Sequence, residues 1–590
     1  MSATTEAAKA PKCPDCEGPM KLRNSVRGNF WGCLDFPSCR GTRKVGEETK
    51  DIPKSKPEYE PIPKLPGTDE QEAIWSHFQT NQKEHAIVEA VAGSGKTWAS
   101  VQLCLRLPKN LKIGFFAFNK HIAKEAGGKL LASGCAHVNC STSHSLGLKI
   151  CKSAWKDAKI DDAEEKVWEI LYKFPVPTEY AGRQWEWDET LRLTHKLVGF
   201  AKNYMLGPNT PDLAERLEQI CEHHGIDMNG SAKAALAMVA PTLQQDITGA
   251  KDLIDFDDMI WLPVVCKLSV PWWLQFDVLI CDEYQDFNLA QQELAVMCCP
   301  RGRIVVVGDR HQALYGFRGA DTEAIPTAIK RLEGTARGVK IFPLTLTHRC
   351  PKLHVKMVQS LVPQIRAMEN APDGEVYNLS QKDAINNMKP GDLVLCRINA
   401  ALIPAAYGLI KRGIKPIIRG RDIGKGMLSL VEKLEKKGAF TLPELTTKLV
   451  EYRRAEADKL RALGSKGAGR LSALMDKCEC MVEMIRGAGT IGELKARINS
   501  IFADFDEGGE PKNAVVLGTV HRTKGLESHR VFVLAPNLLP HPMALQDWEK
   551  VQERNCCYVA ATRAKFDKDN PGTLIFCGGI PEIYGAAETV

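Results

Sequence analysis

The sequence of 590 residues lacks several features that would set it apart from ordinary soluble globular proteins. It has no apolar run of about eighteen residues or more, so no membrane-spanning helix is expected. Its first residues, Met1 to Lys12, are polar and lack the apolar stretch of a secretory signal. Neither sign of charge dominates, because 78 Lys and Arg against 72 Asp and Glu leave a net charge of +6. This small excess is compatible with a nucleic-acid partner but does not indicate one.

Disulfide-type spacing is also missing from most of the 20 cysteines. Sixteen are scattered along the chain, often inside apolar runs such as Ile280–Asp282 and Met297–Cys299. This distribution is typical of buried free thiols in a reducing, intracellular compartment. The remaining four have the spacing of a metal site.

A small metal-binding module is predicted at residues 1–42. Cys13 and Cys16 flank a Pro-Asp knuckle, and Cys33 and Cys39 supply a second pair. Two such pairs give the tetrahedral set of four thiolates that Zn²⁺ prefers at closed structural sites. Because a unit of this size has a small core, the metal would supply much of its folding stability.

The same module is basic and rich in aromatic residues. Between residues 12 and 44 there are seven Lys or Arg and three Asp or Glu, with Phe30, Trp31 and Phe36 among them. Basic charge beside aromatic faces favours contact with single-stranded nucleic acid. The alternative is that these rings only pack the small core. The segment from Phe30 to Thr42 resembles the C-terminal zinc fingers of type I topoisomerases, which implies a DNA-binding accessory without topoisomerase chemistry.

Composition changes twice after this module. Residues 43–66 carry five prolines among Lys and Glu, which predicts a semi-extended linker, with a partner-docking segment as the alternative. From residue 67 onward, short apolar segments alternate with helical patterns, as expected of parallel strands buried on both faces. The predicted strands are Ala86–Val91, Lys112–Phe118, Phe276–Cys281, Arg303–Val307, Asp392–Cys396, Ala514–Thr519, Val531–Ala535 and Thr573–Cys577.

Two long stretches break this alternation of strands and helices. Residues 150–249 and 425–510 have charged and apolar residues at helical spacing, so we expect them to be helical insertions in an α/β core. No internal repeat of fixed period is visible.

A phosphate-binding loop is predicted directly after the first strand. The segment from Ala90 to Thr97 matches the pattern G-x-x-x-x-G-K-[ST], with Ala90 at the first position. Small residues let the backbone N–H groups wrap the phosphates, while the lysine reaches the β- and γ-phosphates and the hydroxyl ligates Mg²⁺. The residues expected to contact ATP and its metal through this loop are Ala92, Gly93, Ser94, Gly95, Lys96 and Thr97.

A pair of carboxylates follows the strand Phe276–Cys281. An aspartate at the end of such a strand, here Asp282, can hold Mg²⁺, and the following Glu283 can activate the attacking water. The alternative, an acidic pair that caps a helix, is disfavoured by the apolar run before it and by Tyr284-Gln285-Asp286 after it.

From Thr68 to Thr573 the chain resembles the UvrD/Rep/PcrA group of superfamily 1 DNA helicases, motif by motif and in order. Asp69-Glu70-Gln71 resembles the Q motif, and Asp282–Asp286 resembles motif II. The segment Phe118-Asn119-Lys120 and the short length look most like the F-box DNA helicase branch, although no F-box is evident.

The resemblance implies further contacts with the nucleotide. It assigns adenine recognition to Gln71 and sensing of the γ-phosphate to Gln312 of motif III. Arg349 of motif IV and Arg563 of motif VI would reach the γ-phosphate from the second lobe, with Arg563 as the arginine finger, and would stabilise charge in the transition state. Other nucleotide contacts are implied at His348 and Glu527.

The resemblance also implies a path for single-stranded DNA. Tyr315 and Phe317 beside Arg318 could form a stacking platform with a cationic neighbour, although aromatic residues more often belong to a core. The residues implied to line the path are Phe118, Asn119 and Lys120 of motif Ia, His144 of motif Ib, Tyr315, Phe317 and Arg318 of motif III, and His521 and Lys524 of motif V.

The expected fold is therefore α/β, with two RecA-like parallel-sheet motor domains, helical insertions and an N-terminal zinc module. ATP, Mg²⁺ held by Thr97 and Asp282, and Zn²⁺ are the expected cofactors. The expected partners are single-stranded and tailed duplex DNA and a protein for loading or activation, without a membrane. The first motor domain is expected at residues 67–149 and 250–335, and the second at 336–424 and 511–590.

The resemblance leaves the biological role open among replication, repair and recombination, and it also leaves several biochemical activities open. The first is unwinding of duplex DNA with 3′ to 5′ movement, and the second is translocation that strips bound proteins with little unwinding. The insertion between Asp422 and Val515 is shorter than in the larger bacterial enzymes, which favours the second slightly. A DNA-recruited ATP switch and an RNA track are further alternatives. His348 stands where the family usually has an aromatic residue against adenine.

Overall fold

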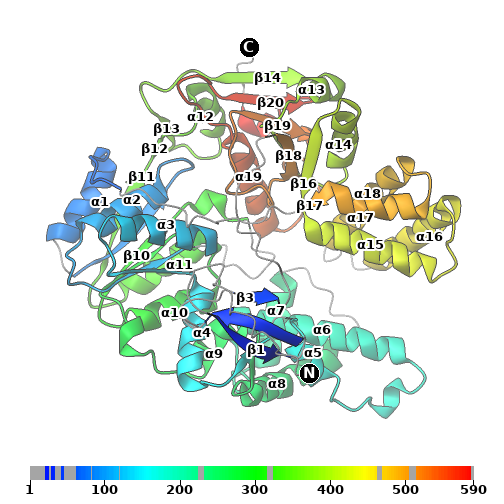
Figure 1. The fold of residues 1–590 in the computed structure, drawn as a ribbon, viewed down its shortest axis with the longest axis horizontal. Coiled ribbons are helices and arrows are strands. Elements are labelled where there is room, and N and C mark those ends of the chain that lie inside the picture. The colour runs from blue at the N-terminus through cyan, green and yellow to red at the C-terminus, as the bar shows by residue number, and fades with distance from the viewer. Residues whose placement is uncertain are drawn as a thin grey trace, which may run out of the picture. The chain divides into compact units, whose positions relative to one another are not determined.

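The computed structural model describes residues 20–25, 28–33, 42–44, 62–80, 83–117, 120–161, 163–223, 232–314, 323–461, 468–503 and 513–585 (Figure 1). Contacts divide the chain into two units, Met1–Ile62 with Ala132–Gly134, and Pro63–Leu131 with Cys135–Val590. In the first unit β1 (Met20–Ser25), β2 (Gly28–Cys33) and β3 (Thr42–Lys44) form an antiparallel sheet. Apart from Ala132 at the end of α3 (Lys120–Ala132), the elements described below belong to the second unit.

A six-stranded parallel sheet forms the first half of the second unit. Its order is β11 (Val339–Leu344), β4 (His85–Ala90), β10 (Arg303–Gly308), β9 (Val278–Cys281), β5 (Ile113–Phe116) and β6 (Val138–Ser141). The strands β4, β5, β9 and β10 are almost wholly buried, as their apolar runs require. The helices outside the large insertion are α1 (Asp69–Thr80), α2 (Lys96–Arg106), α3 (Lys120–Ala132), α10 (Leu289–Cys298) and α11 (Ala324–Glu333).

A seven-stranded parallel sheet forms the second half. Its order is β14 (Glu375–Leu379), β20 (Thr573–Cys577), β19 (Arg530–Leu534), β15 (Leu393–Cys396), β18 (Ala514–Thr519), β16 (Lys415–Arg419) and β17 (Phe502–Ala503). Alternate residues of one strand enter different cores, with Leu393 and Leu395 in one and Val394 and Cys396 in the other. The sheet is thus buried on both faces. Its helices are α12 (Lys352–Val358), α13 (Gln381–Asn387), α14 (Leu402–Lys411) and α19 (Asp547–Ala561).

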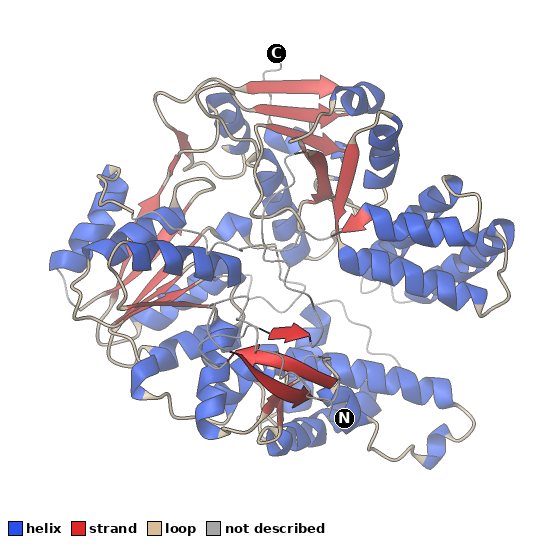
Figure 2. Cartoon of the chain, viewed as in Figure 1, coloured by secondary structure: helices blue, strands red, loops and turns tan. Residues whose placement is uncertain are grey.

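Two helix-rich stretches accompany the sheets, and their helices are drawn in blue, like all others, in Figure 2. The first contains α4 (Ser143–Ala154), α5 (Lys166–Leu171), α6 (Gln184–Asn203), α7 (Leu213–His223), α8 (Ala232–Gly249) and α9 (Asp258–Val265), with the small parallel pair β7 (Lys159–Ile160) and β8 (Leu253–Ile254). The second contains α15 (Arg421–Glu435), α16 (Leu442–Arg461), α17 (Ala468–Arg486) and α18 (Ile491–Ile501). Within the described residues no helix is long and apolar enough to cross a membrane.

The remaining short elements connect these parts. They are the pair β12 (Leu346–Thr347) and β13 (Arg366–Ala367), and the 3-10 turns η1 (Thr178–Tyr180), η2 (Trp272–Leu274), η3 (Tyr284–Asp286), η4 (Arg310–Gln312), η7 (Pro536–Leu538) and η8 (Glu582–Tyr584).

All eight predicted strands are present, but one predicted boundary is wrong. The first sheet does not end near residue 335, because β11 pairs with β4 from Val339 to Leu344. This strand lies at the edge of the sheet, and Lys340 and Pro343 interrupt the continuous apolar run that is typical of a central strand. Of the predicted linker 43–66, residues 45–61 lie outside the described part of the chain.

Candidate ATP and nucleic-acid sites

The predicted phosphate-binding loop lies between the end of β4 and the start of α2. Gly93 and Gly95 have φ values of 72° and 77°, in the left-handed region that glycine adopts readily. A Cβ on Gly93 would stand 2.5 Å from Cβ of Arg349 and 2.6 Å from Oγ1 of Thr347. Only glycine therefore lets the loop pass this close to the second half of the unit. The loop opens onto the N-terminus of α2, where free N–H groups favour an anion.

Motif II brings two carboxylates to the first residues of α2. The hydroxyl of Thr97 donates to Oδ2 of Asp282 at 2.6 Å, and Nζ of Lys96 lies 3.7 Å from Oε1 of Glu283. Burial, then the charge of Glu283, raises the pKa of Asp282 to about 6. A hydroxyl and a buried, charge-repelled carboxylate in contact are a fitting donor set for Mg²⁺, which would relieve that repulsion.

Glu283 keeps its negative charge. Burial alone would raise its pKa, but the ammonium groups of Lys96 and then Lys524 lower the pKa to about 2. Its carboxylate is therefore ionised at neutral pH and accepts a hydrogen bond from Nε2 of Gln285 at 2.5 Å. Such a group can orient a water molecule and accept its proton.

A tyrosine of α19 joins motif III to the phosphate-binding loop. The Tyr558 hydroxyl accepts the N–H of Ala92 at 2.7 Å and donates to Oδ2 of Asp309 at 3.3 Å. The same carboxylate oxygen accepts Nε2 of Gln312 at 2.7 Å. The predicted γ-phosphate sensor therefore shares a buried network with a residue of the second sheet's helix.

Arg349 lies beside the predicted nucleotide loop, and Arg563 lies close enough to Arg349 for their charges to interact. The N–H of His348 donates to the Gly93 carbonyl at 2.8 Å, which places Arg349 next to the loop. Nε of Arg349 lies 2.7 Å from Oε2 of Glu527. Arg563 is 2% exposed, and burial, then the charge of Arg349, lowers its pKa to about 10. Its Nε donates to the carbonyl of Val559, so in this structure the Arg563 side chain is held against the last turn of α19, which ends at Ala561.

The Q motif contacts the loop directly. Oε1 of Gln71 accepts the N–H of Thr68 at 3.0 Å, and its Nε2 donates to the carbonyl of Ser94 at 3.3 Å. This buried glutamine is thus positioned next to the bound nucleotide expected at the loop.

Several predicted DNA contacts lie outside the described residues, namely Phe118, Asn119, Tyr315, Phe317 and Arg318. Lys120 is exposed at the start of α3. His521 contacts Sγ of Cys556 through Nε2 at 3.6 Å. The structure gives these residues no further role, and their DNA contacts stay predictions.

Lys524 has protein partners here. Its Nζ lies 2.5 Å from Oδ2 of Asp286 and 2.7 Å from the Gln312 carbonyl, and its side chain is 8% exposed. Motif V is thereby fastened to motifs II and III. The sequence pattern did not anticipate this link between the two sheets, and a DNA contact of Lys524 stays a prediction.

A further aromatic residue lies beside motif Ib. The ring of His144 stacks on Phe256, with centroids 4.0 Å apart, and Phe256 is 53% exposed. Burial lowers the pKa of His144 to about 4, so this ring is neutral near pH 7. We did not predict Phe256 as a DNA contact; an apolar ring between Asp255 and Asp257 was the signal that could have indicated it.

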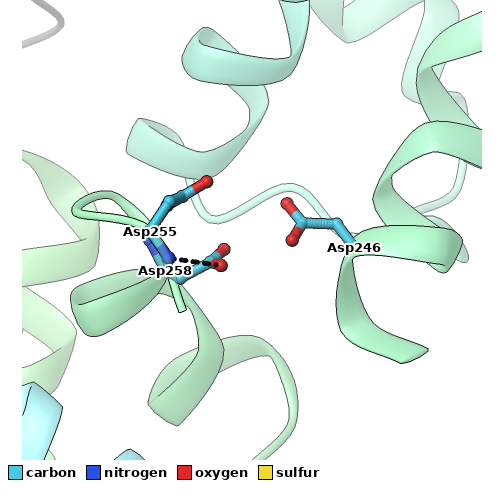
Figure 3. Close-up of side chains that lie close together, drawn as sticks. All are labelled: Asp246, Asp255 and Asp258. Atoms are coloured by element: carbon cyan, nitrogen blue, oxygen red, sulfur yellow. Dashed lines mark hydrogen bonds between the residues drawn. The ribbon is translucent and has the colours of Figure 1, made fainter. Parts of the chain in front are cut away.

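The segment before motif II is fastened by a buried charge cluster (Figure 3). Asp246, Asp255 and Asp258 turn their carboxylates toward one another. Nζ of Lys202 lies 2.6, 2.6 and 2.8 Å from these carboxylates in that order, and Lys166 contacts Asp246 and Asp258. Two ammonium groups thus stand where a metal ion would need to bind, so the cluster is a structural ion-pair network that joins α5, α6 and α8 to the segment before β9.

The predicted zinc ligands are not tested by the structure. Cys13, Cys16 and Cys39 lie outside the described residues, as does the side chain of Cys33 at the end of β2.

A loop of the phosphate-binding pattern on one parallel sheet, with Arg349 beside it, is the arrangement expected of an ATPase with two lobes. Sequence comparison gives the family. Residues 68–333 match the UvrD/REP helicase N-terminal domain, 428–567 the UvrD-like helicase C-terminal domain and 10–48 the topoisomerase DNA-binding C4 zinc finger. The chain belongs to the UvrD/Rep helicase family.

Curated relatives agree with this assignment. The F-box DNA helicase protein 1 of Schizosaccharomyces pombe is 23% identical over 552 residues, which cover 85% of this chain and 57% of the relative. The ATP-dependent DNA helicase Rep of Buchnera aphidicola is 26% identical over 335 residues (52% and 47%), and PcrA of Staphylococcus aureus is 44% identical over 280 residues (43% and 36%). The matched part of this chain thus spans about a third to somewhat over half of each relative.

Proposed function

We propose that this protein is an ATP-dependent DNA helicase that moves 3′ to 5′ along single-stranded DNA and opens duplex DNA ahead of it. The observation that carries the proposal is the network in which Tyr558 of the second lobe bonds both the phosphate-binding loop and Asp309. A motor needs such a link, because hydrolysis at one lobe must change the position of the other. The direction of movement rests on the family resemblance.

The ATP site would work through groups that are already in place. The loop's N–H groups and Lys96 bind the phosphates, and Thr97 with Asp282 would hold Mg²⁺, which offsets phosphate charge when bound. Glu283 accepts the proton of the attacking water. Arg349 exchanges its carboxylate partner, Glu527, for the γ-phosphate, and we assign the finger role to Arg563.

Movement on DNA would follow from opening and closing of the lobes. ATP draws Arg349 toward the phosphates and strengthens lobe contact, and loss of phosphate weakens it. The strand path would include Lys120, His144 and the stacked Phe256, together with the predicted residues of motifs Ia, III and V.

The domain assignment is also a proposal. We assign residues 1–42 to a zinc module with Cys13, Cys16, Cys33 and Cys39 as ligands and DNA as its partner, 43–66 to a linker, and residues up to Leu344 to the first lobe with 150–249 as its insertion. The second lobe follows, with 425–510 as its insertion. We also propose a reducing compartment, because sixteen cysteines in the described part of the chain have free thiols and most of them are buried.

A second candidate function is translocation that removes bound proteins with little unwinding. It is favoured by the compact insertion α15–α18, which packs against the core of the second sheet. A loading or activating protein would then supply what the insertion lacks.

DNA-stimulated ATP hydrolysis tests the shared part of both candidates. Wild-type protein should hydrolyse ATP faster with oligo(dT) than without it or with oligo(rU). Lys96→Ala should abolish turnover while DNA binding persists, and Lys129→Ala, which changes a half-exposed lysine of α3 that pairs with Glu125, should match wild type. Undiminished turnover in Lys96→Ala would remove the assignment of the loop.

A further inference from the structure

The amino ends of the strands in the first sheet form an edge remote from the ATP site. Because all six strands are parallel, the loops that enter them lie together on the side opposite the phosphate-binding loop and motif II. We call residues 83–84, 109–112, 272–277, 300–303 and 335–338 the amino edge. Backbone bonds hold these loops together, for example from Arg303 N–H to the Asp277 carbonyl at 2.9 Å and from Asp277 N–H to the Lys112 carbonyl at 2.8 Å.

Two adjacent tryptophans project from this edge. Trp272 and Trp273 of η2 are 68% and 54% exposed, whereas the next residue, Leu274, is buried and anchors the turn. Their ring centroids are 6.0 Å apart and the rings stand at 88° to each other. Tryptophan has a large apolar surface that proteins usually bury, so an exposed pair indicates an interaction surface.

Positive charge lies beside Trp272 and further along the amino edge. Nζ of Lys112 lies 4.3 Å from the centre of the Trp272 ring and donates to the Trp272 carbonyl at 3.4 Å. Arg337 donates to the carbonyl of Arg301, which links the next basic loops along the edge. The acidic residues in these loops are Glu84 and Asp277, and the Asp277 carboxylate accepts the N–H of Lys112 at 2.8 Å.

The charges of two arginines of the amino edge also act on the buried side chain of His85. His85 at the start of β4 has a pKa of about 4, lowered first by burial and then by the charges of Arg337 and Arg303. The guanidinium of Arg303 lies 4.4 Å over the ring of Phe78.

We propose that the amino edge is a docking surface for an acidic protein segment that carries an apolar side chain. Tryptophan and arginine dominate the binding energy of protein interfaces, and complementary charge orients the partner. A protein is favoured over a second nucleic-acid strand, because perpendicular rings offer no continuous platform for successive bases and Lys112 already covers one face of Trp272. This role is separate from the helicase function and needs none of the ATP-site residues.

A peptide-binding experiment with the full chain tests the proposal. The probe is a fluorescein-labelled peptide of Asp and Glu residues around one Phe and one Leu, and its binding is followed by fluorescence anisotropy at low and high salt. Two control peptides carry Asn and Gln in place of the acids, or Ser in place of Phe and Leu. The variant is Trp272→Ala with Trp273→Ala. The matched control is Trp185→Ala, which changes another tryptophan, 65% exposed, on α6.

The expected result is binding of the acidic peptide that weakens about tenfold or more in the double variant and persists in Trp185→Ala. Lys112→Glu with Arg301→Glu should weaken binding too, and high salt should do the same. DNA-stimulated ATPase should stay at the wild-type rate in every variant, which also reports correct folding. The proposal is overturned if wild type does not bind the peptide, or if the double variant binds it as tightly as Trp185→Ala does. It is also overturned if oligo(dT) binding, and not peptide binding, depends on Trp272 and Trp273.

Discussion

Replacement of Lys202 by Met should loosen the helical insertion of the first lobe. The ammonium of Lys202 is 2% exposed and contacts three buried carboxylates within 2.8 Å. Without it, Lys166 would still contact Asp246 and Asp258, but Asp255 would lose the ammonium group that contacts it here. Loss of one partner from a buried ion pair costs about 3–5 kcal/mol, because uncompensated charge stays in the interior. At about 1.4 kcal/mol per factor of ten, local opening should become about 10²- to 4 × 10³-fold more frequent.

Hydrogen exchange read by mass spectrometry measures this effect locally. Backbone amides of α6, α8 and the segment before α9 should lose protection in Lys202→Met, while β18 and β19 of the second lobe should keep theirs. The matched control is Lys196→Met, which removes an exposed lysine from the same helix. Equal protection in Lys202→Met and wild type would refute the assignment of the cluster as a fastening network.

The pH dependence of the defect gives an independent check. Removal of a cation raises the pKa of each buried carboxyl above its unfolded value. Such a group costs most stability at neutral pH, where the unfolded chain is ionised, and the cost disappears as the pH falls through the raised pKa toward about 4. The protection lost in Lys202→Met should therefore return in part between pH 7 and pH 5. A defect that grows on acidification would contradict the reasoning.

Four further changes have defined outcomes. Tyr558→Phe leaves the Ala92 N–H without its acceptor, which costs about 1–3 kcal/mol, so kcat for ATP should fall about 5- to 100-fold while KM changes little. An unchanged kcat would show that this hydrogen bond does not contribute to ATP hydrolysis. Arg563→Ala should lose turnover far more than nucleotide affinity, measured by steady-state kinetics and analogue binding; equal losses would exclude a finger role. Burial holds the pKa of His354 at about 4, below its unfolded value near 6.5, so its contribution to stability, about 3 kcal/mol, is complete above pH 6.5 and is lost as the pH falls to 4. The free energy of unfolding of His354→Gln, measured in urea, should lack this dependence on pH. The same dependence on pH in His354→Gln and wild type would refute the prediction. Cys13→Ser should lower the zinc content by mass spectrometry and weaken DNA binding but keep the ATPase, and a wild-type chain without zinc would end the metal assignment.

The sequence predicted the site best where the chemistry depends on residues that are adjacent in the chain. The loop from Ala90 to Thr97 and the pair Asp282–Glu283 each follow a buried apolar strand, so the ends of parallel strands bring them together. The eight central strands were predictable for the same reason, since burial on both faces requires a continuous apolar run.

Contacts between distant residues were beyond the reach of local patterns. Tyr558 and Ala92 are 466 positions apart, and no periodicity indicates that one hydroxyl joins them. Lys202 lies on the inward face of an amphipathic helix, where its charge looked like any other helical charge until the fold brought three aspartates to it. The edge strand β11 was not predicted, because only one of its sides pairs and Lys340 and Pro343 interrupt its apolar residues.

Strand displacement tests the central claim most directly. Two duplexes, one with a 3′ single-stranded tail and one with a 5′ tail, are incubated with ATP and wild-type protein, and Lys96→Ala serves as the control for contaminating activity. Displacement from the 3′-tailed duplex alone, absent in Lys96→Ala, is the predicted result. Displacement from neither duplex, with ATPase still stimulated by DNA, would contradict unwinding and leave translocation as the function of this motor.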